Sequence, residues 1–211
     1  MSITLLLVIL TGFISYQAFN NPELKAKLMF IPDAVNRRNE YYRFLTSGFV
    51  HADFNHLLIN LFVLYMFGQV VEELFQAYFG QIGIILYLIL YLGAIIAANY
   101  PDYLIHRNHF GYAALGASGG TSALVFAYIF IDPWEWLLFP PVPILLFAVG
   151  YLWYSNRMAK IGADNIGHNA HFSGSVFGFL ATLLFGFLFN ADLVSHFLIM
   201  LLQGPKAPPF F

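Results

Sequence analysis

The chain contains six long apolar stretches separated by polar segments, and this alternation limits the folds open to it. A helix that crosses a bilayer needs about 20 mostly apolar residues, because each backbone polar group in lipid must be satisfied inside the helix. The apolar stretches predict helices at approximately 3–19, 55–71, 82–98, 115–132, 142–154 and 169–189. The sequence therefore predicts an all-α membrane protein built as a six-transmembrane-helix bundle.

The composition favours lipid over water as the solvent of this chain. Only 9% of the 211 residues are charged and 60% are hydrophobic, whereas a soluble domain carries roughly 25% charged residues. The net charge is -2 and no basic cluster is present, so nucleic acid is not an expected partner. Cysteine is absent, which excludes disulfides, thiolate metal sites and a cysteine nucleophile. The lipid bilayer is the expected partner, and neither metal nor cofactor is expected.

Residues 1–203 are expected to form one domain, whose first helix is retained rather than removed as a signal peptide. The segment 20–54 should lie at the membrane interface, with a solvated loop as the alternative. It interleaves apolar residues with five of the nine basic ones, Lys25, Lys27, Arg37, Arg38 and Arg43. Residues 192–202 are too few to span alone, so they extend the last helix or lie on the membrane. The Pro-rich tail 204–211 is expected to be disordered.

Three polar clusters stand at the start of three apolar stretches. Ionisable residues inside membrane helices are costly, so they indicate function by default. The clusters contain, in chain order, His51, His56 and Asn60, then Ser118, then His171. His56 and Asn60 are four residues apart and therefore share one helix face.

Small residues follow Ser118 and His171 at intervals of four. Stripes of this kind let two helices approach backbone to backbone. The fourth predicted helix carries Gly119, Ala123 and Ala127, and the sixth carries Gly174 and Gly178. In a six-span bundle these two helices run parallel. If the stripes face each other, Ser118 and His171 meet near the same membrane surface.

A serine beside an imidazole is the minimal arrangement for acyl transfer. A neutral histidine within hydrogen-bond reach can take the hydroxyl proton during attack. The tetrahedral oxyanion then needs donors, for which the Ser118 amide, His56 and Asn60 are candidates. No acidic residue lies close to His171 in the sequence, so the predicted pair is a dyad rather than a triad.

Each of these residues also has a structural interpretation. Ser118 alone could be a packing residue, His171 a hydrogen-bonded structural residue, and Asn60 an interhelical bond. His168, His171 and His56 could bind a metal, although no carboxylate joins them. The G-x-S-x-G pattern at 116–120 matches the nucleophile elbow of soluble hydrolases, but no strand precedes it. The joint position of the three clusters favours function.

At these residues the sequence resembles the rhomboid family of intramembrane serine proteases, over about 42–178. YRFLTSGFVHADFNHLLIN at 42–60 resembles the family's loop and second helix, with His51, His56 and Asn60 in register. GASG at 116–119 resembles the serine motif, in which Gly116 precedes Ser118. AHFSG at 170–174, followed by Gly178, resembles the histidine motif. The order and spacing of the three motifs carry the resemblance.

The resemblance implies a rhomboid-type serine endopeptidase that cleaves transmembrane segments of single-pass membrane proteins. It implies Ser118 as nucleophile, His171 as general base, and an oxyanion site of His56, Asn60 and the Ser118 amide. It also implies structural roles for Arg43 and Glu72, an outer-leaflet position for 20–54, and a substrate gate formed by 142–154 and the following loop. The expected location is a bacterial inner (plasma) membrane, with the active site opening to the outer side.

Two features depart from the family's pattern. Many members carry an aromatic residue four positions after the serine, packed on the catalytic imidazole. Ser122 stands there in this chain, so either another side chain orients His171 or its ring is held more loosely. In addition, the loops after the first, third and fifth helices hold eight of the nine Lys and Arg. The positive-inside rule would place these loops in the cytoplasm, opposite to the family orientation adopted here.

Two other functions stay open. One is a catalytically silent rhomboid-like protein that binds or escorts membrane helices, although both dyad residues are present. The other is a transporter or channel with a histidine-lined path, for which repeated halves or broken helices would be expected.

Overall fold

A computed structural model describes residues 2–138, 140–161 and 167–205. Within these ranges the regular structure is helical, apart from isolated bridges that pair Phe30 with Ala114 and Trp136 with Pro143. The elements are α1 (Ile3–Asn20), α2 (Pro22–Leu28), α3 (Pro32–Arg38), α4 (Arg43–Thr46), η1 (Ser47–Phe49), α5 (Phe54–Phe79), η2 (Gly80–Ile82), α6 (Gly83–His106), α7 (Ser118–Tyr128), α8 (Ile144–Ile161), α9 (His168–Phe189) and α10 (Ala191–Gln203).

Helices occupy all six places at which the sequence predicts them, namely α1, α5, α6, α7, α8 and α9. Three described stretches are long and apolar enough to cross a membrane: α1, the stretch Phe54–His106 that joins α5 and α6, and α9. Large apolar side chains on these helices are exposed, for example Phe13, Phe62 and Phe187. Exposed apolar side chains along such helices suit contact with lipid. The protein is an all-α membrane bundle.

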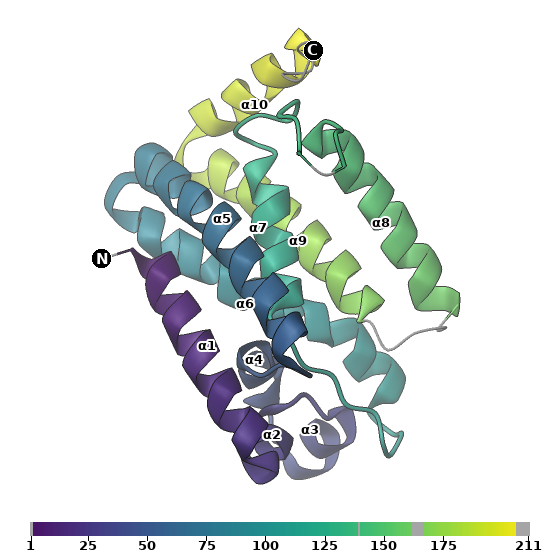
Figure 1. Cartoon of the computed structure of the whole chain (residues 1–211). Helices are drawn as coiled ribbons and strands as arrows, with labels where there is room; N and C mark the ends of the chain where they lie inside the picture. Colours follow the sequence, from purple (N-terminus) through teal and green to yellow (C-terminus); the bar gives the residue numbers. More distant parts are fainter. Residues whose placement is uncertain (1, 139, 162–166, 206–211) are drawn as a thin grey trace.

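The bundle is organised around α6, α7 and α9, which pack against one another (Figure 1). α7 is almost fully buried because α5, α6 and α9 surround it. α1 packs on α5, while α8 lies at the side of the bundle against α9 (Figure 1). The short helices α2–α4 close one end, and α10 lies at the opposite end (Figure 1). A site built at the start of α7 is therefore enclosed by other helices.

The predicted end of the second helix at 71 is wrong, because α5 continues to Phe79. Glu72 was expected to stop the helix, yet it is buried. Its carboxylate accepts hydrogen bonds from the backbone N–H of Ile3 (3.0 Å) and Thr4 (2.8 Å) and from the Ser2 hydroxyl (2.8 Å). An acidic side chain at the N-terminus of another helix satisfies N–H groups that lack partners. Glu72 thus caps α1 without ending α5.

Three further predicted boundaries also need correction. α6 continues through Pro101 to His106, although the third helix was expected to end near 98. α8 extends to Ile161, beyond the predicted end at 154. α7 is 11 residues long, much shorter than the predicted 115–132. Its late start follows from Gly116, whose φ of 124° lies outside the helical region, so the helix cannot extend back beyond Ser118 through this residue.

The segment 20–54 contains α2, α3, α4 and η1 rather than a loop. Arg43 is buried and ties these pieces together by donating to the carbonyl oxygens of Ala26 and Met29, both at 2.8 Å. It also pairs with Glu40. Arg43 therefore satisfies carbonyl groups at the end of α2 and holds the segment as a folded unit.

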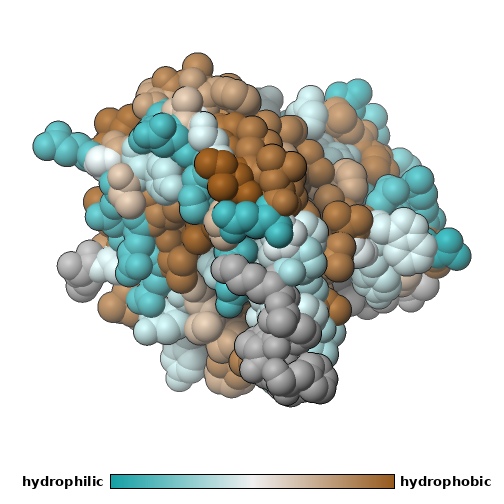
Figure 2. All heavy atoms as spheres, turned by 90° about the horizontal axis from the view of Figure 1, so that it is seen from above, coloured by the Kyte–Doolittle hydropathy of each residue, from teal (hydrophilic) through white to brown (hydrophobic). Residues whose placement is uncertain are grey.

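Residues 192–202 belong to a separate helix, α10, which begins after an extended residue, Asn190. Leu193, Val194 and Phe197 are buried, whereas Leu198, Ile199 and Leu202 are exposed. Figure 2 looks onto this end and shows hydrophobic residues reaching the surface among hydrophilic ones. Such two-sided helices are typical of the membrane interface. Residues 206–211 of the predicted disordered tail lie outside the described residues.

Candidate active site

The residues selected from the sequence lie on three helices that begin at the same end of the bundle. Ser118 is the first residue of α7, and His171 lies in the first turn of α9. His56 and Asn60 occupy the first two turns of α5. All three helices start at the end that α2–α4 close (Figure 1). Ser118, His56 and His171 are partly exposed, and Asn60 is buried.

α7 and α9 touch backbone to backbone just beyond Ser118 and His171. A Cβ atom on Gly174 would lie 2.2 Å from the carbonyl oxygen of Gly119, and one on Gly178 would lie 2.4 Å from the Cα of Ala123. A Cβ on Gly119 would meet the Ala170 carbonyl oxygen at 3.7 Å and the Ala98 Cβ at 2.3 Å. The two small-residue stripes therefore face each other, and Ser118 and His171 each adjoin a residue of this contact.

His51 holds the backbone that precedes Ser118. Its Nε2 accepts a hydrogen bond from the Ala117 N–H at 3.1 Å, and its Nδ1 donates to the Ser15 hydroxyl at 2.9 Å. The Ser15 hydroxyl in turn donates to the Phe49 carbonyl oxygen at 2.9 Å. Burial lowers the pKa of His51 from 6.5 to about 3. The imidazole is thus neutral and fixed in one tautomer, and it links α1 to the loop that precedes Ser118.

Gly116 lets the loop that precedes Ser118 pass in close contact with the His56 ring. A Cβ at this position would lie 2.6 Å from His56 Cε1, closer than real side chains approach. The φ of 124° is likewise unfavourable for residues other than glycine. The Gly116 N–H donates to the Ser47 carbonyl oxygen at 2.9 Å. Glycine is needed here for both the backbone conformation and the space.

His56 and Asn60 are connected to each other and to α7. The Asn60 amide donates to the His56 carbonyl oxygen at 2.9 Å, and its oxygen accepts from the Thr121 hydroxyl at 3.3 Å. Thr121 also reaches the Ser118 carbonyl oxygen at 3.2 Å. His56 Nδ1 accepts from the Ala52 N–H at 3.5 Å, which leaves the proton on Nε2. Asn60 therefore lies beside the first turn of α7, while the His56 ring lies beside Gly116, just before that helix.

An aromatic ring lies against His171, but it comes from α8. The rings of Tyr151 and His171 are nearly parallel, with an interplanar angle of 21° and centroids 5.9 Å apart. The Tyr151 hydroxyl is 3.3 Å from the hydroxyl of Ser122, the residue four positions after Ser118. Sequence reasoning missed Tyr151. The only available signal was the spacing of Phe147, Tyr151 and Tyr154, which share one face of a helix.

Sequence reasoning also missed a buried carboxylate close to the start of α9. Asp102 on α6 accepts hydrogen bonds from the Asn169 side-chain amide at 2.7 Å and from the Tyr112 hydroxyl at 2.6 Å. Burial and the nearby Asp102 raise the pKa of the Tyr112 phenol, so Tyr112 remains a donor. Asp102 thereby fixes both the loop before Ser118 and the turn that carries His171.

The all-helical membrane bundle, with His56 and Asn60, Ser118 and His171 at the starts of three of its helices, is a fold of rhomboid type. The Rhomboid domain family matches residues 38–187 of this chain, and the chain belongs to the rhomboid family.

Curated relatives agree with this assignment. Rhomboid-related protein 1 of Caenorhabditis elegans is 30% identical over 77% of this chain and 44% of its own length. Rhomboid-like protein 11, chloroplastic, of Arabidopsis thaliana is 32% identical over 65% of this chain and 50% of its own. RHOMBOID-like protein 12, mitochondrial, from the same plant is 28% identical over 80% of this chain and 53% of its own. The chain thus spans about half the length of these relatives.

Proposed function

We propose that this protein is an intramembrane serine protease in which Ser118 is the nucleophile and His171 the general base. Its substrates are transmembrane segments of single-pass membrane proteins. The observation that carries the proposal is the backbone contact of Gly119 with Gly174, because it brings together the first turns of α7 and α9, on which the two residues lie. Membership of a family whose members are generally serine proteases supports it.

The proposed reaction has two steps. His171 takes the proton of Ser118 while the hydroxyl oxygen attacks the scissile carbonyl carbon, and the tetrahedral oxyanion collapses as His171 protonates the leaving amine. In the second step His171 activates a water, which attacks the acyl-enzyme, and Ser118 recovers its proton. The products are two peptide fragments that carry the new carboxyl and amino ends.

Three groups around Ser118 are suited to stabilise the oxyanion. The Ser118 N–H stands at the N-terminus of α7, where backbone donors lack intrahelical partners. His56 presents an N–H at Nε2, since its Nδ1 accepts from Ala52. Asn60 uses one amide hydrogen on the His56 carbonyl, and an amide carries two. Donors of this kind typically contribute 10²–10³-fold each to the rate.

The length of α7 supports a reaction below the membrane surface. Eleven residues span only about 16 Å at 1.5 Å per residue, against about 30 Å for the hydrocarbon core. α7 is followed closely by Trp134 and Trp136, residue types that favour the interface. A helix that ends at one interface and is this short begins well inside the bilayer, so Ser118 would meet substrates within their transmembrane segments.

We further propose that the end bearing α2–α4 faces the outer side of a bacterial plasma membrane. Because the chain lacks cysteine, single cysteines can report the orientation. Tyr41→Cys, at an exposed position of that end, should react with a membrane-impermeant maleimide on intact cells. Gln81→Cys, in the turn between α5 and α6, should react only after permeabilisation. The reverse pattern would show that the charge rule, rather than the family orientation, applies.

Labelling by a fluorophosphonate probe distinguishes a protease from a catalytically silent relative. The probe phosphonylates a serine only when that serine is activated as a nucleophile. We expect the purified wild-type protein in detergent to be labelled at Ser118, and the Ser118→Ala variant to remain unlabelled. Equal labelling of both, or labelling of neither, would contradict the proposed activity and favour a protein that only binds membrane helices.

A further inference from the structure

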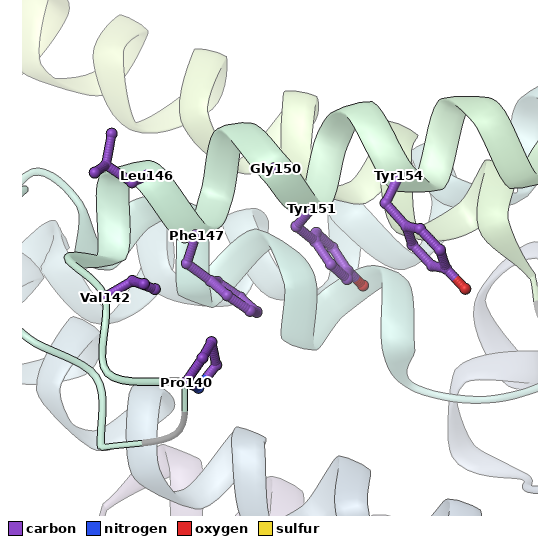
Figure 3. Close-up of a pocket in the computed structure, with 7 residues that line it drawn as sticks. All are labelled: Pro140, Val142, Leu146, Phe147, Gly150, Tyr151 and Tyr154. Atoms are coloured by element: carbon purple, nitrogen blue, oxygen red, sulfur yellow. The ribbon is translucent and has the colours of Figure 1, made fainter.

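The aromatic stacking on His171 continues into α8 as a row of three rings. Phe147 stacks on Tyr151 at an interplanar angle of 17° with centroids 5.9 Å apart, and Tyr151 stacks in turn on His171. The rings of Tyr154 and His168 make a second contact between the two helices, with centroids 5.6 Å apart and an interplanar angle of 81°. Figure 3 shows Phe147, Tyr151 and Tyr154 projecting from the same side of α8. One face of α8 therefore contacts the first turn of α9 through aromatic rings.

Ser122 connects the same tyrosine to α7. Its hydroxyl lies 3.3 Å from the Tyr151 hydroxyl, and Ser122 is buried one helical turn after Ser118. A larger side chain at 122 would compete with Tyr151 for this space. The small residue on α7 and the ring on α8 thus form a matched pair, and Tyr151 contacts both helices of the dyad.

We propose that Tyr151 is a positioning residue that orients the imidazole of His171 toward Ser118, so that the general base is held by α8. This inference rests on the proposed protease function. A flat ring parallel to an imidazole limits rotation of the side chain by contact with the ring face, and a general base must be held in one orientation. The chain thereby supplies from α8 the aromatic contact that its α7 lacks.

The position of α8 then affects catalysis directly. α8 packs on α9 at the side of the bundle and borders an open, apolar cavity of about 360 Å³ lined by Pro140, Val142, Leu146, Phe147, Gly150, Tyr151 and Tyr154 (Figure 3). Tyr151 belongs to the wall of this cavity and also contacts His171. A displacement of α8 would withdraw the ring from the imidazole, so full activity requires α8 to be seated against α9.

The test compares variants of Tyr151 in a reporter-cleavage assay with purified protein in liposomes. Tyr151→Leu and Tyr151→Met remove the flat ring and keep an apolar side chain, whereas Tyr151→Phe keeps the ring and removes only the hydroxyl. Both non-aromatic variants should lose about 10- to 100-fold in kcat with KM within about twofold of wild type, as for a misplaced catalytic group. Tyr151→Phe should stay within about threefold of wild type, because the bond to Ser122 is long.

Phe187→Leu is the matched control, since it also removes a ring, here from an exposed position near the far end of α9, and it should match wild type. The inference is overturned if the non-aromatic variants retain kcat, if their loss appears in KM instead, or if Tyr151→Phe loses as much as they do. Thermal unfolding of each variant separates loss of fold from loss of positioning. A lower kcat in Tyr151→Leu and Tyr151→Met counts as a positioning defect only if both variants remain folded. A wild type no more active than Ser118→Ala would instead refute the protease function, and the positioning role with it.

Discussion

Ser118→Ala is expected to lower the cleavage of a transmembrane reporter by about 10⁴-fold or more, to the background rate. Without the hydroxyl no acyl-enzyme can form, and His171 has no proton to take. His171→Ala should cost about as much, because an unassisted hydroxyl is a weak nucleophile. Residues that act as a unit are strongly non-additive, so the double variant should be no slower than either single variant.

The measurement is initial cleavage rate in liposomes at equal amounts of folded protein. Ser173→Ala provides the control, since it removes a serine hydroxyl from α9 two residues after His171 and should cleave at the wild-type rate. Activity of Ser118→Ala above about one hundredth of wild type would show that another group performs the attack. Strict additivity of the two single losses would show that Ser118 and His171 do not function as a pair.

The existence of the helices could be predicted because hydropathy is a local property of the chain. Their ends could not, because they depend on partners far away in sequence. Glu72 looked like a stop signal, yet its partners are the N–H groups of Ile3 and Thr4 in the first turn of α1, 69 and 68 residues earlier in the chain. Arg43 similarly satisfies carbonyl groups of Ala26 and Met29. The chain continues as a helix through Glu72 because residues of α1 satisfy its carboxylate.

The candidate site likewise contains residues that local sequence motifs could predict and residues that they could not. Motif spacing selected Ser118, His171, His56 and Asn60. These residues lie within the first two turns of three helices at one end of the bundle. The residues that surround them came from elsewhere in the chain. Tyr151 lies 20 positions before His171 and Asp102 lies 67 before Asn169. No periodic pattern relates residues on separate helices. The serine at position 122 therefore indicated that the usual aromatic contact with His171 was missing from α7, but not that Tyr151 of α8 supplies one.

Gly174→Ala is expected to destabilise the bundle by at least about 3 kcal/mol and to abolish most of the cleavage activity. The added methyl would lie 2.2 Å from the Gly119 carbonyl oxygen, and backbone cannot move aside as the tip of a side chain can. Overpacking a tight core typically costs 1–3 kcal/mol, occasionally more, and here the only relief is to separate α7 from α9. A shift of about 1 Å between Ser118 and His171 is enough to cost roughly 10²-fold in rate.

Gly12→Ala in α1 is the matched control, because its methyl would meet only Leu61 at 3.5 Å, an ordinary contact. Alanine favours a helix over glycine by about 1 kcal/mol, so this variant should be as stable as wild type or slightly more so. Unfolding in detergent and cleavage in liposomes measure the two effects separately. A Gly174→Ala protein with wild-type stability and activity would mean that α7 and α9 do not need their close approach. A stable but inactive one would mean that the contact serves chiefly to align serine and histidine.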